Sequence, residues 1–256
     1  MALTPPIADP QTDDAHPAPR HEQAIRQSWA RNAAVWAEVV RADAIASRRE
    51  VTNAAILQVL RRYAPRRLLD IGCGEGWLMR QMNLHGATCV GIDAEPTLIS
   101  AACGAGGGEF AVCDYAGLAD WARRTGRAPF DVCVCNFSLI GAQSTEAVFA
   151  AAQHLLVPGG RLVVQTLHPG AVGGSEDYVS GWRAGSWSGF DARFTEPAPW
   201  YFRTLSDWFA LFVRHGFCLE VLQEPVDPST RRPVSLILAG VRVEPASAHA
   251  GSAPVD

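Results

Sequence analysis

Apolar runs alternate with amphipathic stretches through the middle of the chain. The apolar runs predict strands at residues 67–72, 88–93, 109–114, 130–137 and 160–167. The amphipathic stretches predict helices that begin near Gly76, Glu95, Tyr115 and Gln143. Strands that alternate with helices in this way form a parallel sheet with helices on both faces. The pattern therefore predicts an α/β fold.

Two kinds of segment flank this alternation on the N-terminal and C-terminal sides. Residues 24–64 carry apolar positions at helical spacing in two stripes, which predicts a helical cover. Residues 1–23 and 244–256 are rich in Pro, Ala, Ser and Asp, a composition typical of disordered tails. A single domain is therefore expected over residues 24–243, since a chain of 256 residues buries one substantial core.

The alternation stops after the fifth predicted strand. Residues 168–203 are rich in Gly, Ser and Pro but also hold eight aromatic residues, which argues against disorder. We expect this segment to form a lid. A helix resumes with Ser206 and Asp207 as its N-terminal cap, and two strands at 217–223 and 234–243 are predicted to pair as an antiparallel edge.

Composition and charge exclude several classes of protein. The formal charge of −4 gives no basic footprint for nucleic acid, and the absence of lysine excludes a P-loop or a Schiff-base enzyme. Seven cysteines without zinc spacing indicate small buried thiols in a reducing compartment, and no metal site is expected. No apolar stretch approaches the length of a membrane span, so we expect a cytoplasmic protein.

A glycine-rich turn follows the first predicted strand, in the sequence Asp70-Ile-Gly-Cys-Gly-Glu-Gly-Trp77. The spacing is G-x-G-x-G, and Trp77 occupies the position where a dinucleotide-binding loop needs its last glycine. Asp70 and Glu75 place negative charge beside the loop, which suits a cationic ligand better than a pyrophosphate. An NAD(P)-dependent oxidoreductase is therefore the weaker alternative.

Three acids follow three successive strands: Asp70 in the first, Asp93 at the end of the second and Asp114 at the end of the third. Together with the glycine turn, this set resembles the cofactor loop of class I methyltransferases that use S-adenosylmethionine (SAM). The segment 156–163, Leu-Val-Pro-Gly-Gly-Arg-Leu-Val, also resembles the turn into that family's fifth strand. The broad bacterial group of small-molecule enzymes that includes ubiquinone-pathway methyltransferases is the most similar.

The resemblance implies a Rossmann-like sheet of seven mostly parallel strands, and SAM as the cofactor. It assigns Asp93 to the ribose hydroxyls, Asp114 and the amide of Tyr115 to the adenine, and Asn136 to the methionine part. The expected cofactor site also includes Asp70, Gly72, Cys73, Gly74 and Ala94. The chain lacks the Asn-Pro-Pro-Tyr-like motif of amide methylation and the lysine–carboxylate cluster that holds magnesium in catechol methyltransferases.

Two residues of the helical cover are further candidates for the cofactor site. Arg48 is placed to hold the methionine carboxylate by a bidentate contact, with a solvated helix face as the alternative. Trp36 is placed to close over the sulfonium by a cation–π contact, with a purely structural core aromatic as the alternative.

His168 is the candidate general base, because it directly follows the fifth strand and an imidazole can accept a proton near neutral pH. A structural histidine is the alternative. The aromatic segment supplies the candidate acceptor pocket, and arginines beside the aromatics hint at an anionic acceptor. The residues expected there are Tyr178, Trp182, Arg183, Trp200, Tyr201 and Arg203.

The sequence thus predicts transfer of a methyl group from SAM to an oxygen or nitrogen atom of a small molecule. A SAM-binding sensor or assembly partner without methyltransferase activity is the alternative from another class. The sequence predicts neither a nucleic-acid nor a membrane partner, and it leaves open whether the protein is a monomer or a homodimer.

Overall fold

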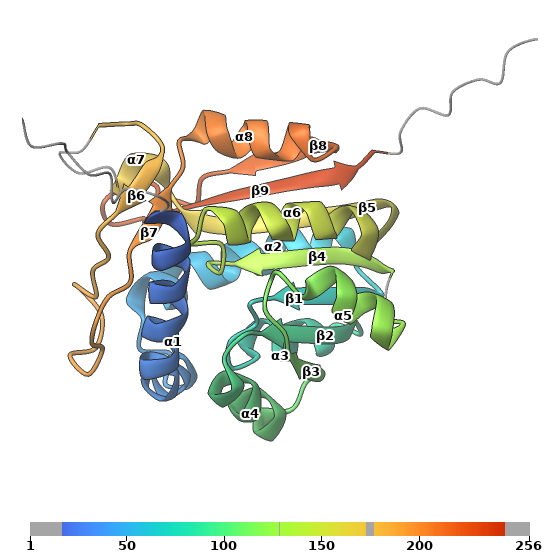
Figure 1. Ribbon diagram of the computed structural model, residues 1–256, viewed down its shortest axis with the longest axis horizontal. Helices are drawn as coiled ribbons and strands as arrows, with labels where there is room; N and C mark the ends of the chain where they lie inside the picture. The colour runs from blue at the N-terminus through green and yellow to red at the C-terminus, as the bar shows by residue number, and fades with distance from the viewer. Residues whose placement is uncertain (1–16, 128, 173–176, 244–256) are drawn as a thin grey trace, which may run out of the picture.

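The computed structural model describes residues 17–127, 129–172 and 177–243 (Figure 1). Its main sheet has seven strands in the order β3-β2-β1-β4-β5-β9-β8, of which the first five are parallel and β9 runs antiparallel to both neighbours. The strands are β1 (Arg67–Ile71), β2 (Thr88–Asp93), β3 (Glu109–Val112), β4 (Phe130–Asn136), β5 (Leu156–Leu167), β8 (Phe217–Gln223) and β9 (Ser235–Arg242). The predicted Rossmann-like sheet is confirmed.

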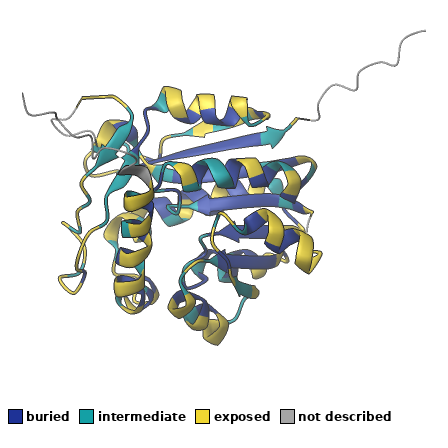
Figure 2. Cartoon of the chain, viewed as in Figure 1, coloured by how far each residue is buried: buried dark blue, intermediate teal, exposed yellow. Residues whose placement is uncertain are grey.

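Two hydrophobic cores lie on opposite faces of this sheet. One contains side chains of α5 (Leu118–Thr125), α6 (Gln143–Leu155) and α8 (Leu205–Arg214). The other contains side chains of α2 (Asn53–Tyr63) and α3 (Trp77–Asn83), with Ile99 of α4 (Pro96–Ala105). The central strands are buried along almost their whole length because both faces are covered (Figure 2).

The N-terminal cover differs from the expected one in two ways. Helix α1 (Pro17–Arg41) starts seven residues before the boundary at 24, so the end of the segment predicted as a tail is helical. The cover is also broken: Asp43 has a φ of 51°, and a π-helix, η1 (Arg48–Thr52), precedes α2. Helix α1 begins at Pro17, and a proline is suited to the first turn of a helix because it has no N–H that would be left unpaired there.

The described parts of the segment 168–203, residues 168–172 and 177–203, contain helix and strand that the sequence did not predict. They hold a short helix, α7 (Pro169–Val172), and two strands, β6 (Gly181–Arg183) and β7 (Trp200–Phe202), which pair antiparallel. Helix α8 then begins at Leu205 with Thr204, not Ser206, as its N-cap, since the Thr204 hydroxyl accepts a hydrogen bond from the Asp207 N–H at 3.1 Å. The tails 1–16 and 244–256 lie outside the described residues.

The carboxyl ends of the parallel strands point toward the end of the sheet that α1 and the β6–β7 pair cover (Figure 1). Helix α1 contacts the segment before β7 directly: Asn32 donates to the Thr195 carbonyl at 2.8 Å and accepts from the Thr195 N–H at 2.9 Å. In open α/β sheets ligands bind at this end of the strands. Helix α1 and the segment that contains β6 and β7 therefore cover the end of the sheet at which a ligand is expected to bind.

Candidate functional site

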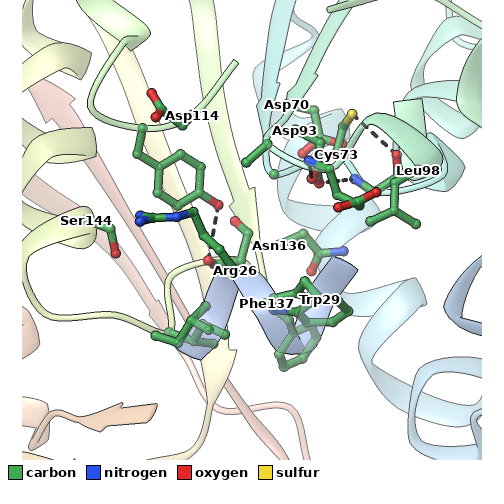
Figure 3. Close-up of a pocket in the computed structure, with 18 of the residues that line it drawn as sticks. Arg26, Trp29, Asp70, Cys73, Asp93, Leu98, Asp114, Asn136, Phe137 and Ser144 are labelled. Carbon is green, nitrogen blue, oxygen red and sulfur yellow. Dashed lines mark hydrogen bonds between the residues drawn. The ribbon is translucent and has the colours of Figure 1, made fainter. Parts of the chain in front are cut away.

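A cavity of about 550 Å³ lies at the carboxyl ends of β1, β2 and β4. Asp70 and Asp93 lie together on one side of it and Asp114 on the other, with Asn136 between them (Figure 3). Helix α1 closes the cavity with Ile25, Trp29, Trp36 and Val40. Every cofactor residue expected from the sequence lines this cavity: Trp36, Arg48, Asp70, Gly72, Cys73, Gly74, Asp93, Ala94, Asp114, Tyr115 and Asn136.

At the glycine turn the cavity wall consists of backbone atoms, because Gly72 and Gly74 have no side chains. Gly72 and Gly74 have φ angles of +77° and +56°, in the left-handed region that favours glycine. A Cβ atom on Gly72 would collide with Ser138 and Tyr115. Gly76 has a packing role that the spacing did not reveal, because a Cβ there would press against the Phe110 ring.

Asp93 holds the glycine turn in place. One carboxylate oxygen accepts a hydrogen bond from the Gly74 N–H at 2.9 Å, and the other accepts from the Glu95 N–H at 2.9 Å. Burial raises the pKa of the Asp93 carboxyl, and these backbone hydrogen bonds oppose the rise. Each oxygen keeps a lone pair for a further donor, such as a hydroxyl.

Asp70 has a buried carboxyl group, one oxygen of which makes no hydrogen bond to the described residues. It is 1% exposed, and its Oδ1 atom has no hydrogen-bond partner in the described part of the chain. Burial and the nearby Asp93 carboxylate raise the pKa of Asp70 to about 8, against the opposing effect of Arg48. A buried acid of this kind in a cavity wall is suited to a cationic ligand.

Glu75 does not supply the free negative charge expected from the sequence. Its carboxylate is buried and forms ion pairs with Arg80 at 2.7 Å and with Arg41 at 3.3 Å. Arg80 follows Glu75 by five residues and is a local partner, whereas Arg41 reaches it from the end of α1. The pairing neutralises Glu75 and fastens α1 to the glycine turn.

The far side of the cavity is formed by the ends of β3 and β4. Asp114 accepts the Gly117 N–H at 2.7 Å through one oxygen and leaves the other oxygen for a ligand. The Tyr115 hydroxyl donates to the Ser138 carbonyl at 3.1 Å, which fixes the ring across the glycine turn. The Oδ1 atom of Asn136 is buried without a partner among the described residues.

Arg48 lies between two tryptophan rings. Its guanidinium carbon is 5.7 Å from the centre of the Trp36 ring and 5.3 Å from that of Trp77, and its Nε atom donates to Asn53 at 3.3 Å. Burial lowers the pKa of the guanidinium. Arg48 is also the first residue of the π-helix, a distortion that is frequent at functional sites.

A second cavity, of about 500 Å³, adjoins the first, and aromatic residues are numerous in its lining. Trp29, Trp36, Arg48, Phe137 and Ile140 line both cavities, so the two share a wall. Phe137 has a φ of +56°, a strained conformation for a bulky residue and one that clusters at ligand sites. Neither Trp29 nor Phe137 was identified as a site residue from the sequence.

The lid segment supplies part of the second cavity. Of the six residues expected there, Trp200, Tyr201 and Arg203 line it. The other three, Tyr178, Trp182 and Arg183, do not belong to its lining. Trp187 and Phe190 line it instead, and their rings pack against those of Trp29 and Trp36.

The three excluded residues have structural contacts. The Tyr178 hydroxyl accepts the Leu205 N–H at 2.9 Å, at the start of α8. Trp182 packs on the rings of Tyr201 and His21, and Arg183 lies 3.5 Å from the centre of the Phe202 ring. Tyr178 lies before β6, and Trp182 and Arg183 belong to β6, none of whose residues line the cavity, whereas all three residues of β7 do.

His168 lines neither of the two cavities. Its Nδ1 atom accepts the Gly170 N–H at 3.1 Å, so Nε2 carries the proton and donates it to Glu224 at 2.7 Å. The neighbours Leu167 and Pro169 line the second cavity, whereas the imidazole turns toward the segment after β8. The geometry supports the structural alternative for His168 rather than the general base.

A family model described as a methyltransferase domain matches residues 45–218. The chain belongs to this methyltransferase family. The matched range contains β1–β5, the glycine turn and the three strand-end acids, so the resemblance inferred from those residues is confirmed. The family assignment favours the methyltransferase interpretation over the dinucleotide alternative.

Curated relatives match this chain over part of its length. Two ubiquinone biosynthesis O-methyltransferases, from Xylella fastidiosa and Xanthomonas oryzae, are 36% and 35% identical over 104 and 105 residues. Each match covers 40% of this chain and 42% or 43% of the relative. The matched part of this chain thus spans less than half the length of these relatives.

Solved structures share the fold of the whole domain. The 1,6-didemethyltoxoflavin-N1-methyltransferase of Burkholderia thailandensis superposes with a TM-score of 0.64 at 17% identity and covers 94% of both chains. A SAM-dependent methyltransferase from Mesorhizobium loti gives a TM-score of 0.54 at 22% identity, over 72% of this chain and 96% of its own. At these identities the likeness shows the fold.

Proposed function

We propose that the protein transfers the methyl group of SAM to an oxygen or nitrogen atom of a small-molecule acceptor. The observation that carries the proposal is the pair of adjoining cavities, one lined by the glycine turn and its acids and one lined by aromatic and aliphatic residues. The first would hold the methyl donor and is called the donor cavity, and the second would hold the acceptor and is called the acceptor cavity. Their shared wall would bring the two reactants together. Holding both reactants in line supplies most of the acceleration for an activated leaving group.

The first cavity fits the charge pattern of SAM. The Oδ1 atoms of Asp70 and Asn136 are buried without partners among the residues that the structure describes, and both suit the ammonium group of the methionine part. Arg48 would hold the methionine carboxylate, Asp93 the ribose hydroxyls, and Asp114 with the Tyr115 amide the adenine. SAM supplies a methyl group activated by its sulfonium centre when it is bound.

The chain's own residues would orient the reactants and exclude water. Helix α1 covers the donor cavity, and its link through Asn32 to Thr195 joins this cover to the lid over the acceptor cavity. Trp36, in the wall of both cavities, would shield the sulfonium by a cation–π contact. We further propose a cytoplasmic location, which the seven free thiols support.

The test combines binding with turnover. Calorimetry on the full chain should show binding of SAM and S-adenosylhomocysteine, and Asp93→Ala should weaken it roughly 10- to 150-fold by removing a charge-assisted acceptor. The exposed Asp120→Asn serves as the matched control. Unchanged affinity in a folded Asp93→Ala protein would exclude the assigned site.

An acceptor screen with methyl-labelled SAM then separates an enzyme from a sensor. Label transferred to a small molecule supports the proposal. Tight SAM binding without transfer to any small molecule or macromolecule in a cell extract would favour the SAM-binding protein without activity.

A further inference from the structure

We infer that the acceptor cavity takes a planar aromatic molecule that carries an anionic oxygen group, and that Arg203 binds this group. The inference rests on the proposed function and names the chemical class of its acceptor. It depends on three features of the second cavity: the shape of its walls, the sign of its charges and an unsatisfied nitrogen.

The walls of the cavity include flat rings from three separate parts of the chain. Helix α1 contributes Trp29 and Trp36, the end of β4 contributes Phe137, and the lid contributes Trp187 and Trp200. Aromatic walls bind planar rings by stacking and edge contacts, which an aliphatic chain of equal size makes less well. A volume of about 500 Å³ suits a ligand of a few fused rings.

The charged groups in the described lining of this cavity are both cations, Arg48 and Arg203. Arg48 reaches the donor cavity as well and lies near the carboxyl of Asp70. Arg203 belongs to the acceptor cavity and not to the donor cavity. The electrostatic preference of the acceptor cavity is therefore for an anion.

Arg203 is a buried cation without a carboxylate at ion-pair distance among the described residues. It is 5% exposed, and its Nη2 atom donates to the carbonyls of Gly141 and Ala142 at 2.9 and 3.0 Å. Its Nη1 atom has no hydrogen-bond partner in the described chain. Its guanidinium lies 4.8 Å from the Tyr201 ring centre and 5.1 Å from that of Trp208.

This arrangement costs free energy unless a ligand completes it. An unpaired buried donor is unfavourable, and burial of the guanidinium is only partly offset by the Glu146 and Glu22 carboxylates, which act on it without an ion pair. The two carbonyls and two rings fix the guanidinium, and Arg203 forms part of the cavity wall. A carboxylate or phenolate oxygen bound there would supply an acceptor for the guanidinium and a negative charge beside it.

The experiment compares three probes of similar size: 2-naphthoate, its neutral amide 2-naphthamide, and the saturated decahydro-2-naphthoate. Each is titrated by calorimetry into the full chain saturated with S-adenosylhomocysteine. We expect 2-naphthoate to bind roughly tenfold or more tightly than the amide, since it forms a charge-assisted hydrogen bond. It should also bind more tightly than the saturated acid.

The variants assign the preference to a residue. Arg203→Gln should abolish the preference for the acid over the amide, and Arg203→Lys should retain part of it. Arg193→Gln, at an exposed arginine of the same lid, should leave it unchanged.

Several results would overturn the inference: equal binding of acid and amide, equal binding of the aromatic and saturated acids, or an Arg203→Gln variant that keeps the preference. Should Arg203→Gln fail to fold, the three probes on the unmodified chain and Arg203→Lys decide. Absence of binding by all probes at millimolar concentration also overturns it. Because S-adenosylhomocysteine binding is measured in the same samples, that result leaves the proposed donor site standing.

Discussion

At the scale of single residues, Asp70 makes the stability of the protein depend on pH. Its pKa is 3.8 in an unperturbed state and about 8 in the folded protein. A carboxyl whose folded pKa is raised stabilises the protein fully below pH 4, and the contribution is lost as the pH rises to about 8. The site thus holds an acid whose ionised form is unfavourable until a cation binds.

Asp70→Asn tests this property, because an amide has the shape of the protonated acid and does not titrate. Without ligand, the melting temperature of the variant should rise relative to the unmodified protein as the pH is raised from 5 to 8. Its affinity for SAM should fall. Differential scanning fluorimetry across this pH range measures the first effect, with Asp120→Asn as the exposed control. A constant difference from pH 5 to 8 would contradict the raised pKa.

His168 provides a second test at this scale. Since its two ring nitrogens contact Gly170 and Glu224, we expect His168→Ala to lower stability and to leave the shape of the pH–activity profile unchanged. Glu224→Gln should behave in the same way, because it weakens the same contact. If the alanine variant alone lost a titrating limb, the general-base role would be restored.

At the scale of elements, α1 is fastened to the rest of the fold by Glu22. Its carboxylate accepts the N–H groups of Ala142 and Gln143 at 2.8 and 2.9 Å, at the start of α6. A carboxylate at this position satisfies unpaired donors and favours the positive end of the helix. One side chain therefore caps α6 and anchors the cover of the donor cavity.

Glu22→Ala should lower the free energy of unfolding by about 0.5–2 kcal/mol, the usual cost of removing a helix cap. It should also weaken S-adenosylhomocysteine binding, because α1 forms a wall of that cavity. Urea denaturation and calorimetry measure the two effects. Glu38→Gln, at an exposed acid of the same helix, is the control, and an equal loss in both variants would contradict the anchoring role.

At the scale of the whole molecule, the donor site joins segments that are far apart in the chain. Residues 17–41, the glycine turn and the ends of β2, β3 and β4 all contribute to one cavity. The described residues contain no helix long and apolar enough to cross a membrane. A ligand that contacts all these segments should hold them together.

We therefore expect S-adenosylhomocysteine to slow amide hydrogen exchange in residues 17–41 more than in β8, which does not reach the cavity. Exchange measured by mass spectrometry with and without the ligand would show the difference. NAD should give no such protection. Uniform slowing in α1 and β8 would indicate global stabilisation and would contradict a ligand site of which α1 forms a wall.

The sequence by itself determined the layered sheet, and it selected the residues of the proposed donor site. Hydrophobic periodicity is a local signal, and it located all seven strands of the main sheet to within four residues at each end. The acids and glycines at strand ends were found because parallel strands bring their carboxyl ends to one edge. Asp70, Gly72 and Asp93 could therefore be placed in one site before any contact was known.

The tertiary structure alone decided where the remaining side chains point. The sequence placed His168 next to the site, but the path of the chain after β5 turned its ring toward Glu224. Likewise, Trp182 and Tyr201 lie opposite each other in β6 and β7, but only Tyr201 lines the cavity, and Trp182 packs against His21 of α1. The orientation of these side chains depends on contacts between residues that lie 56 and 19 positions apart in the sequence. A local pattern of residues therefore does not predict it.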